Sequence, residues 1–518
     1  MKQLLLVVFS LALLLRISAQ SVLISPSSLN FGLVDETDRD SLSFNVVNQS
    51  GNALRIKKLH TPSFYGHRPF TTQQHSAVIP ASGSSLFYVR LAARHNLLHH
   101  APVVIETDSF YGCFAVELNA EVRYSQSYYS STYNLEGQPL FNSLRAKISS
   151  PYTDLGYNGA RDQMYGSIDN VNGQVECVYT GRTATFSTRT GANNNNFNTE
   201  HTFPQGFFNS ASPMKSDIHH LFPTDVNANS QRGNLPFGTV TGSPSWQQGG
   251  SKMGNGVFEP RDIHKGTVAR AMLYFVLRHQ DYSNFLAPQE SLLRTWSATY
   301  PPSAKDINRN NAIAQLQQNR NPFTDYPAFL DRLGPFAQNG TLSTQEWKMY
   351  PDTLYMKYGQ DAHIVLYGKG NQSASLSVAD PALQWSSSAG NGPFAAGIVQ
   401  GDLQLTQNTS GATLVELKVG NTTVDDLWIV YQSSGLSVDE SVAIQVQIAP
   451  NPAGEMVWIN MFGKEGEVIL MDVQGRQLLQ QRVGGEARLD VSTLARGLYQ
   501  IRWKLEGDQW NSERLILR

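Results

Sequence analysis

Glu200 and His201 stand side by side in the stretch FNTEHTFPQGFF, and Asn229 follows them downstream. A neutral histidine can accept a proton near neutral pH, because its ordinary pKa is about 6.5. Carboxylate and amide oxygens are hard ligands that suit Mg²⁺, which keeps several waters and takes a further oxygen from a substrate phosphate. A base and a dication are what phosphodiester hydrolysis requires. In that chemistry His201 would be the base, and Glu200 and Asn229 would supply the oxygens.

More titratable residues crowd the segment 214–234, MKSDIHHLFPTDVNANSQRGN. His219 has two interpretations: it orients His201 or a phosphate, or it is a core histidine bonded to backbone. Arg232 could likewise hold a phosphate or pair with a carboxylate. Asp217 and His220 are expected to be structural.

The surrounding sequence indicates the elements that must position these residues. ATFSTRT and NFNTEHTF alternate as strands do, and the residues after Pro223 up to Gly233 predict a short helix that carries Asn229. Adjacent residues of a strand point to opposite faces. Glu200 and His201 can therefore share a site only if the strand ends or twists there.

Several motifs in this region resemble the bacterial secreted endonuclease I family, whose site is the His-Me finger or ββα-metal motif. They are ECVYTGR, NTEHTFPQGFF, SDIHHLFPTD, NSQRGNLPFG, EPRDIHKGTVARAMLYF and NRNPFTDYP. The resemblance covers about residues 128–336. It implies a nuclease without sequence specificity that cleaves DNA, and often RNA, to 5′-phosphate ends.

The resemblance also assigns roles to residues. It implies that His201 is the general base and that Glu200 and Asn229 hold Mg²⁺, for which Ca²⁺ or Mn²⁺ could substitute. Asn229 is preferred over Asn227 because it stands three residues before Arg-Gly-Asn, where the family places its ligand. Some relatives add an arginine that steadies the product phosphate, on a long disulfide-bonded loop.

That arginine has no counterpart here, because residues 202–213 contain no Arg, Lys or Cys. The phosphate-binding role is either empty or falls to Arg182, Arg189 or Arg232. The sequence leaves these possibilities open.

We predict a multidomain chain in which an α+β His-Me finger nuclease core is flanked by Ig-like β-sandwich domains. The first segment, 1–20, has Lys2, an apolar stretch and small residues, as a signal peptide does. Residues 21–123 alternate in short runs as a β-sandwich does, and SPSSLNFG and VIPASGSS resemble Ig-like domains of the abnormal-spindle/hydin kind. Residues 124–336 form the nuclease domain.

Helical patterns are strongest within this nuclease domain. Leu140, Leu144 and Ile148 share one helical face. Three more patterns follow between Thr267 and Gln318, and we expect their apolar residues to be core, including Ile307.

Residues 337–435 return to alternation and predict a second β-sandwich. Residues 436–518 contain IAPNPAGE, VILMDVQGRQLLQQRV and ARLDVSTLARGLYQIRW, which are similar to the C-terminal sorting domain of type IX secretion cargo. The resemblance implies export through the periplasm to the outside or the cell surface, with the secretion machinery as a partner. No later segment reaches 18 apolar residues, so we expect no transmembrane segment in the mature chain.

Composition limits the alternatives. The net charge is −2, whereas nucleic-acid-binding proteins are more often basic, so any attraction for a polyanion must be local or supplied by a metal. Cys113 and Cys177 are the only two cysteines, and we place them in different domains, buried and unpaired. We expect a monomeric secreted nuclease. The alternative is a catalytically inactive surface adhesin that retains the nuclease fold.

Overall fold

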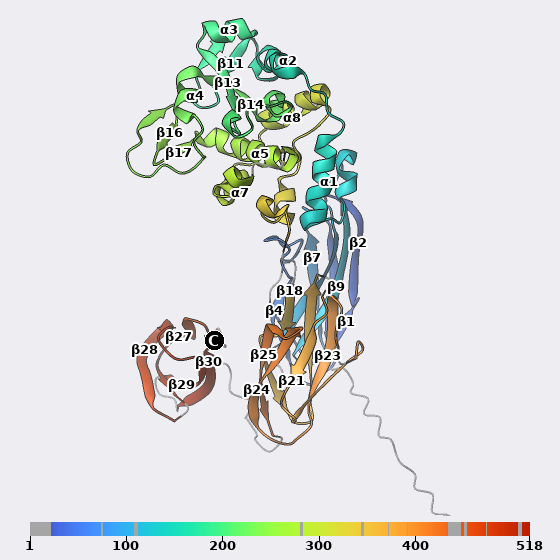
Figure 1. Ribbon diagram of the computed structural model, residues 1–518. Coiled ribbons are helices and arrows are strands. Elements are labelled where there is room, and N and C mark those ends of the chain that lie inside the picture. Colours follow the sequence, from blue (N-terminus) through green and yellow to red (C-terminus); the bar gives the residue numbers. More distant parts are fainter. Residues whose placement is uncertain are drawn as a thin grey trace, which may run out of the picture.

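The structure, a computed structural model, describes most of the chain. The described residues are 22–73, 76–107, 112–279, 283–342, 346–370, 372–390, 392–433, 447–449, 453–472, 474–505 and 510–517. The predicted signal peptide at residues 1–20 lies outside them. The described chain is multidomain and rich in strands (Figure 1).

Two facing sheets form the first unit. Their inner, alternating residues share one core, which includes Phe44 and Phe87 of one sheet and Ile56 and Val103 of the other. The first sheet has the order β1 (Val22–Ser25), β3 (Ser41–Asn48), β7 (Ser84–Leu91), β5 (Phe70–Thr72). The second has the order β2 (Ser28–Asp35), β9 (Cys113–Arg123), β8 (Leu98–Thr107), β4 (Leu54–His60), β6 (Ala77–Ile79).

Helices and short sheets around a second core form the next unit. Its helices are α1 (Gly137–Ser149), α2 (Gly156–Gln163), α3 (Arg189–Asn194), α4 (Val226–Arg232), α5 (Asp262–His279), α6 (Ser283–Leu286), α7 (Glu290–Thr299), α8 (Ala304–Gln317) and α9 (Pro322–Asp325). Its strands are β10 (Asn170–Val171), β11 (Gln174–Glu176), β12 (Thr183–Thr185), β13 (Phe197–His201), β14 (Leu221–Asp225), β15 (Trp246–Gln248), β16 (Ser251–Gly254) and β17 (Val257–Glu259). Short turns η1 (Ser127–Thr132), η2 (Met164–Ile168), η3 (Gln205–Phe207), η4 (Met214–Ser216), η5 (Ile218–His220), η6 (Pro327–Arg332) and η7 (Phe336–Gln338) connect them.

The helical patterns are confirmed in position and corrected in one detail. Helix α1 buries Leu140, Leu144 and Ile148 as expected. Helix α8 starts at a capping box, in which Ser303 and Asp306 satisfy each other's backbone N–H groups. Ile307 is 43% exposed, so its assignment to the core is wrong. Ile313 is the fully buried apolar residue of that helix, because its face lies against the core.

Two further sheets form the second sandwich around a third core. Their orders are β18 (Glu346–Tyr350), β20 (Asp361–Lys369), β23 (Gly397–Leu405), β22 (Leu383–Ser387), and β19 (Thr353–Lys357), β25 (Thr422–Gln432), β24 (Gly411–Val419), β21 (Ser375–Val378). This sandwich lies beside the first one (Figure 1) and contacts it through Val104, Cys113 and Val365. In Figure 1 the helical unit lies above the two sandwiches.

The last described strands form one curled sheet with its own core. They are β26 (Gln447–Ala449), β27 (Met456–Met471), β28 (Gln477–Asp490), β29 (Gly497–Leu505) and β30 (Asn511–Leu517). The predicted hairpin turn lies between β27 and β28, where Asp472 accepts hydrogen bonds from the backbone N–H and the side chain of Arg476.

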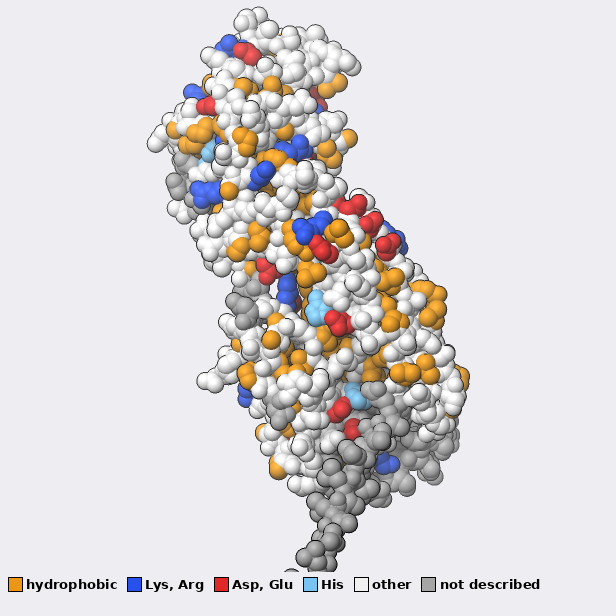
Figure 2. Space-filling view, turned by 90° about the vertical axis from the view of Figure 1, so that its right-hand side faces the viewer, with side chains coloured by type: hydrophobic (Ala, Val, Ile, Leu, Met, Phe, Trp, Pro, Cys, Tyr) orange, Lys and Arg blue, Asp and Glu red, His pale blue; other side chains and the backbone are white. Residues whose placement is uncertain are grey.

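Both cysteines are buried and unpaired, as expected. Within the described residues no helix has the length and apolar character needed to cross a bilayer. Figure 2 shows one face of the molecule, on which Lys and Arg side chains are scattered among polar and apolar ones.

Candidate active site

Two antiparallel strands followed by a helix carry the predicted site residues. Strand β13 pairs with β14, and α4 begins immediately after β14. Asp225 starts this helix because its carboxylate accepts hydrogen bonds from two N–H groups of the first turn. Gly233 ends it with a φ of 50°, which glycine adopts without strain. The short helix predicted from the sequence is present with Asn229 on it.

Helix α4 faces the even-numbered residues of β13. Asn229 and Arg232 are three residues apart, so they lie on one face of the helix. The Asn229 amide donates to Asn198 Oδ1 at 3.0 Å and to the Thr199 carbonyl at 3.5 Å. Arg232 Nε lies 3.3 Å from Glu200 Oε1. The structure therefore brings Asn229 to the stretch of strand that carries Glu200.

Glu200 is held from two sides in a buried position. Its Oε1 accepts a hydrogen bond of 2.6 Å from the Tyr179 hydroxyl and faces Arg232. Burial raises the pKa of Glu200, while Arg232 and Tyr179 oppose that rise. Arg232 also donates to the carbonyls of Thr202 and Gly233, at 2.5 and 2.9 Å. Of the two roles left open for Arg232, the structure places it in the ion pair with a carboxylate.

The odd-numbered residues of β13 face α2 instead. Arg161 Nε donates to Thr199 Oγ1 at 3.1 Å. The His201 ring lies 5.5 Å from the Tyr157 ring, centroid to centroid. Glu200 and His201 thus contact different neighbours, as strand alternation requires, and β13 ends at His201.

One hydrogen bond fixes the protonation pattern of His201. Its Nε2 lies 3.1 Å from the Lys215 carbonyl, and a carbonyl can only accept, so Nε2 carries the hydrogen. Nδ1 then has a lone pair in the neutral ring. Burial lowers the pKa of His201 well below its ordinary value, and the charges of Lys215 and Arg161 act in the same direction. The ring is therefore a neutral proton acceptor at physiological pH.

A buried network holds the turn that supplies this carbonyl. Asp217 directly follows η4, which contains Lys215, and its carboxylate contacts Arg278 and accepts a hydrogen bond of 3.0 Å from Tyr274. Burial works to raise the pKa of Asp217, but the Arg278 charge and the hydrogen bond with His279 lower it well below its ordinary range. Asp217 is structural, as expected.

His219 and His220 both bond to backbone carbonyls. His219 Nε2 donates to Asn319 at 3.2 Å, and His220 Nε2 donates to Met214 at 2.7 Å. Burial lowers the pKa of each ring to about 4. Of the two interpretations of His219, the structure shows the core histidine.

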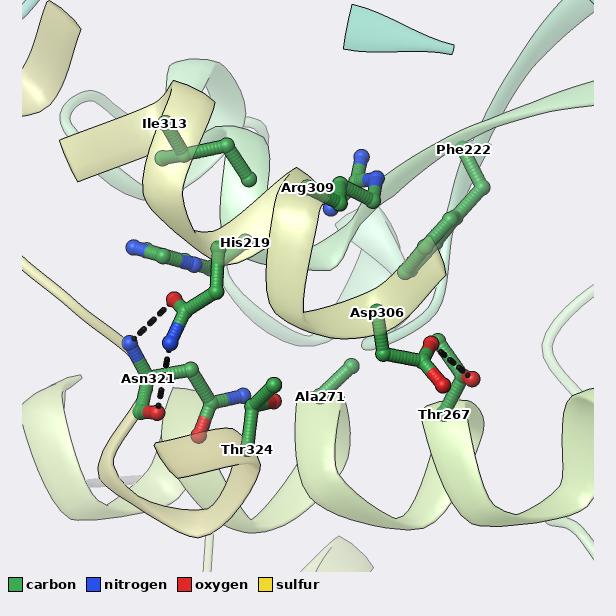
Figure 3. A pocket seen from close by; sticks show the side chains of 10 residues that line it. His219, Phe222, Thr267, Ala271, Asp306, Arg309, Ile313, Asn321 and Thr324 are labelled. Atoms are coloured by element: carbon green, nitrogen blue, oxygen red, sulfur yellow. Dashed lines mark hydrogen bonds between the residues drawn. The ribbon is translucent and has the colours of Figure 1, made fainter. Parts of the chain in front are cut away.

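His219 lines a small pocket away from β13. Figure 3 shows its walls on α5 and α8, with Asp306 bonded to Thr267. Asn310 of α8 also lines the pocket and is bonded to Asn321. Its volume of about 20 Å³ accommodates on the order of one water molecule. It is too small for a nucleotide, so the candidate active site is the strand end and not this pocket.

The other arginines considered from the sequence are paired. Arg182 binds Asp225 at 2.7 Å, and Arg189 binds Asp162 at 2.7 Å. Sequence reasoning missed Arg161, which lies beside His201. Its contact with Thr199 depends on how α2 packs on β13, and the available signal was only that Tyr157 and Arg161 are one helical turn apart.

A metal would have few protein ligands here. Among the described residues no three His, Cys, Asp or Glu side chains cluster as a metal site. Glu200 and Asn229 offer one carboxylate and one amide oxygen. The Asn229 amide nitrogen is turned to the strand, and Glu200 Oε2 makes no hydrogen bond within the described residues, so an oxygen of each is available. This hard donor pair fits Mg²⁺, which is bound through one or two protein groups, waters and substrate phosphates.

Comparison with known proteins agrees with these observations. Residues 138–328 match the family model for endonuclease I, and residues 447–518 match that for a secretion system C-terminal sorting domain. An extracellular ribonuclease of Bacillus amyloliquefaciens is 30% identical over 233 residues, which are 40% of this chain and 78% of that protein. An extracellular deoxyribonuclease of Aeromonas hydrophila is 35% identical over 118 residues, 22% of this chain and 50% of that protein. A periplasmic deoxyribonuclease of the same species is 33% identical over 117 residues, 22% of this chain and 48% of that protein.

These matches confirm the resemblance stated from the motifs and the predicted sorting domain. The sorting domain and the extracellular relatives make this a secreted or cell-surface protein. The chain belongs to the endonuclease I family.

Proposed function

We propose that this protein is a metal-dependent endonuclease that hydrolyses phosphodiester bonds of DNA and RNA without sequence preference, leaving 5′-phosphate ends. The observation that carries the proposal is the neutral His201 at the end of β13, next to a buried carboxylate and an amide brought in by α4. The names of the relatives support both substrates, since they include ribonucleases and deoxyribonucleases.

His201 is the base in this proposal. Its Nδ1 takes a proton from water as the water oxygen attacks phosphorus and the bond from phosphorus to the 3′ oxygen breaks; the leaving 3′ oxygen takes a proton from solvent water. The positive ring that results is held at Nε2 by the Lys215 carbonyl. Its low pKa keeps the ring unprotonated before the reaction. The Lys215 carbonyl also fixes the ring orientation, which holds Nδ1 in position for the proton transfer.

Glu200 and Asn229 would hold Mg²⁺. When bound, the ion supplies positive charge beside the phosphate, where charge grows in the transition state. Tyr179 and Arg232 grip Oε1 of Glu200 and so aim the carboxylate. Arg232 balances part of its charge.

A cleavage assay tests the proposal. Supercoiled plasmid and an RNA transcript are incubated with wild-type protein in Mg²⁺ and in EDTA, and with His201→Ala, Glu200→Gln and Asn229→Ala. We expect cleavage of both substrates in Mg²⁺, none in EDTA, and a loss of about 10²- to 10⁴-fold for His201→Ala. The products should be ligatable without prior phosphorylation.

The matched control is His100→Ala. His100 is an exposed imidazole on β8, paired with Glu117 in the first sandwich, and its removal should leave the rate unchanged. Cleavage that survives both chelation and His201→Ala rejects the proposal. A well-folded wild-type protein that cleaves neither substrate favours the inactive adhesin.

A further inference from the structure

Two cations lie around one aromatic ring beside His201. The Arg161 guanidinium carbon is 5.2 Å from the Tyr157 ring centroid, and Lys215 Nζ is 4.9 Å from the same centroid. Arg161 and Tyr157 are on α2, and Lys215 is on η4, the turn whose carbonyl receives the His201 hydrogen bond. Two separate elements therefore direct positive charge to the face of β13 that carries the base.

Neither cation has an acidic partner among the residues that the structure describes. Within the described chain no carboxylate oxygen lies within 4.0 Å of the charged atoms of Arg161 or Lys215, whereas Arg182, Arg189 and Arg232 are all paired. Two cations around one aromatic ring with no acidic partner in the described chain repel each other, and a bound anion would offset that repulsion.

The free atoms of the two side chains suit a phosphate. Arg161 donates through Nε to Thr199 and also neighbours the Tyr165 hydroxyl, but its terminal nitrogens meet no carboxylate among the described residues. Terminal guanidinium nitrogens bind phosphate oxygens in a two-pronged manner. The Lys215 ammonium makes no hydrogen bond within the described residues either and serves as a point charge on a flexible stem.

We propose that Arg161 and Lys215 bind backbone phosphates of the nucleic-acid strand next to the bond that His201 attacks. This assignment rests on the proposed function, and it says which residues hold the nucleic-acid substrate. It places the phosphate-binding role, for which residues 202–213 offer no cation, on α2 and η4. It also explains how a chain of net charge −2 attracts a polyanion, since the attraction is local.

Salt dependence of binding tests the assignment. Each phosphate contact to a single strand contributes about 0.7 to the slope of log K against log salt concentration. Binding of a labelled single-stranded oligonucleotide is measured in the His201→Ala background, so that no cleavage occurs. We expect Arg161→Ala and Lys215→Ala each to weaken binding by about tenfold and to lower the slope by about 0.7.

Two further variants test whether charge alone accounts for the binding. Arg161→Lys should retain the slope but lose part of the affinity, because the charge stays and the two-pronged bond is lost. Lys305→Ala is the control: it removes an exposed cation from the same unit, where Glu176 keeps Arg261 as a partner, and should leave the slope unchanged. Lys215→Ala removes no hydrogen bond among the described residues and only one ring contact, with Tyr157, so we expect the variant to fold.

The outcomes separate this assignment from the proposed function. Unchanged slopes for both alanine variants overturn it, even when the wild-type protein cleaves DNA. Lowered slopes with a wild-type protein that cleaves nothing retain the binding site and reject the proposed function.

Discussion

The two faces of β13 differ in how their charges are balanced. On the α4 face, Glu200 and Arg232 pair at 3.3 Å, and their side chains are 2% and 1% exposed. On the α2 face, Arg161 and Lys215 lie beside a neutral His201 without acidic partners in the described chain. On the first face the two charges offset each other and leave Glu200 Oε2 for the proposed metal, whereas on the second face the positive charge is available to an anion. One strand thus carries the carboxylate proposed to hold the metal and lies beside the cations proposed to hold substrate phosphates.

The same substitution on the two faces should break this comparison most visibly. Arg232→Met removes one partner of a fully buried pair and leaves Glu200 without its counter-charge, which we expect to reduce the free energy of unfolding by about 3–5 kcal/mol. Arg161→Met removes one hydrogen bond to Thr199 and should cost about 1 kcal/mol. Urea unfolding followed by tryptophan fluorescence measures both. Equal losses of unfolding free energy in the two variants would contradict the proposed difference in charge balance between the two faces.

Acid should destabilise the nuclease unit through two buried histidines. The His220 ring lies 5.5 Å from the His201 ring, His219 lies in the core beside Tyr274, and burial lowers the pKa of both to about 4. The unfolded chain binds protons near pH 6.5 and the folded one does not, so stability is fully present above pH 6.5 and is lost as the pH falls toward 4. Each histidine should cost about 2 kcal/mol between pH 7 and pH 5. Unfolding free energies measured at several pH values check this.

Glu200 contributes to the same titration with the opposite sign. Its pKa is raised by burial, so between pH 4.5 and its higher folded value the folded state binds more protons and gains stability as the pH falls. Replacing His219 with Asn should therefore make the acid loss smaller, and replacing Glu200 with Gln should make it larger. If neither substitution altered the pH dependence of the unfolding free energy, these opposite contributions of His219 and Glu200 would be contradicted.

Sequence alone reached part of this site. The motifs around Glu200, His201 and Asn229 indicated the family, and the rule that neighbouring strand residues point apart anticipated that Glu200 and His201 contact different groups. The helix that carries Asn229 was found from the residues that start and end it.

The rest of the site depends on packing between distant segments. The sequence allows two roles for Arg232, because it does not tell whether a guanidinium is buried against a carboxylate. Arg161 escaped notice because its contact with Thr199 spans 38 positions and arises only when α2 lies against β13. The exposed Ile307 shows the same limit, since helical spacing does not reveal which face of α8 meets the core.

The smallest effect we predict concerns Thr199, which hydrogen-bonds to groups on both faces of β13. Thr199 Oγ1 accepts the Arg161 hydrogen bond and lies 3.0 Å from the Tyr165 hydroxyl, while the Thr199 carbonyl receives the Asn229 amide from the other side. Thr199→Val keeps the shape and the carbonyl but removes the hydroxyl, which we expect to cost about 1 kcal/mol of stability. Because Arg161 keeps its charge but loses its anchor, nucleic-acid binding should weaken while the salt slope stays constant. Thr199→Ser restores the hydroxyl and should restore affinity. If Thr199→Val also weakened metal binding by shifting Asn229, the change on the α2 face of β13 would be shown to reach the α4 face.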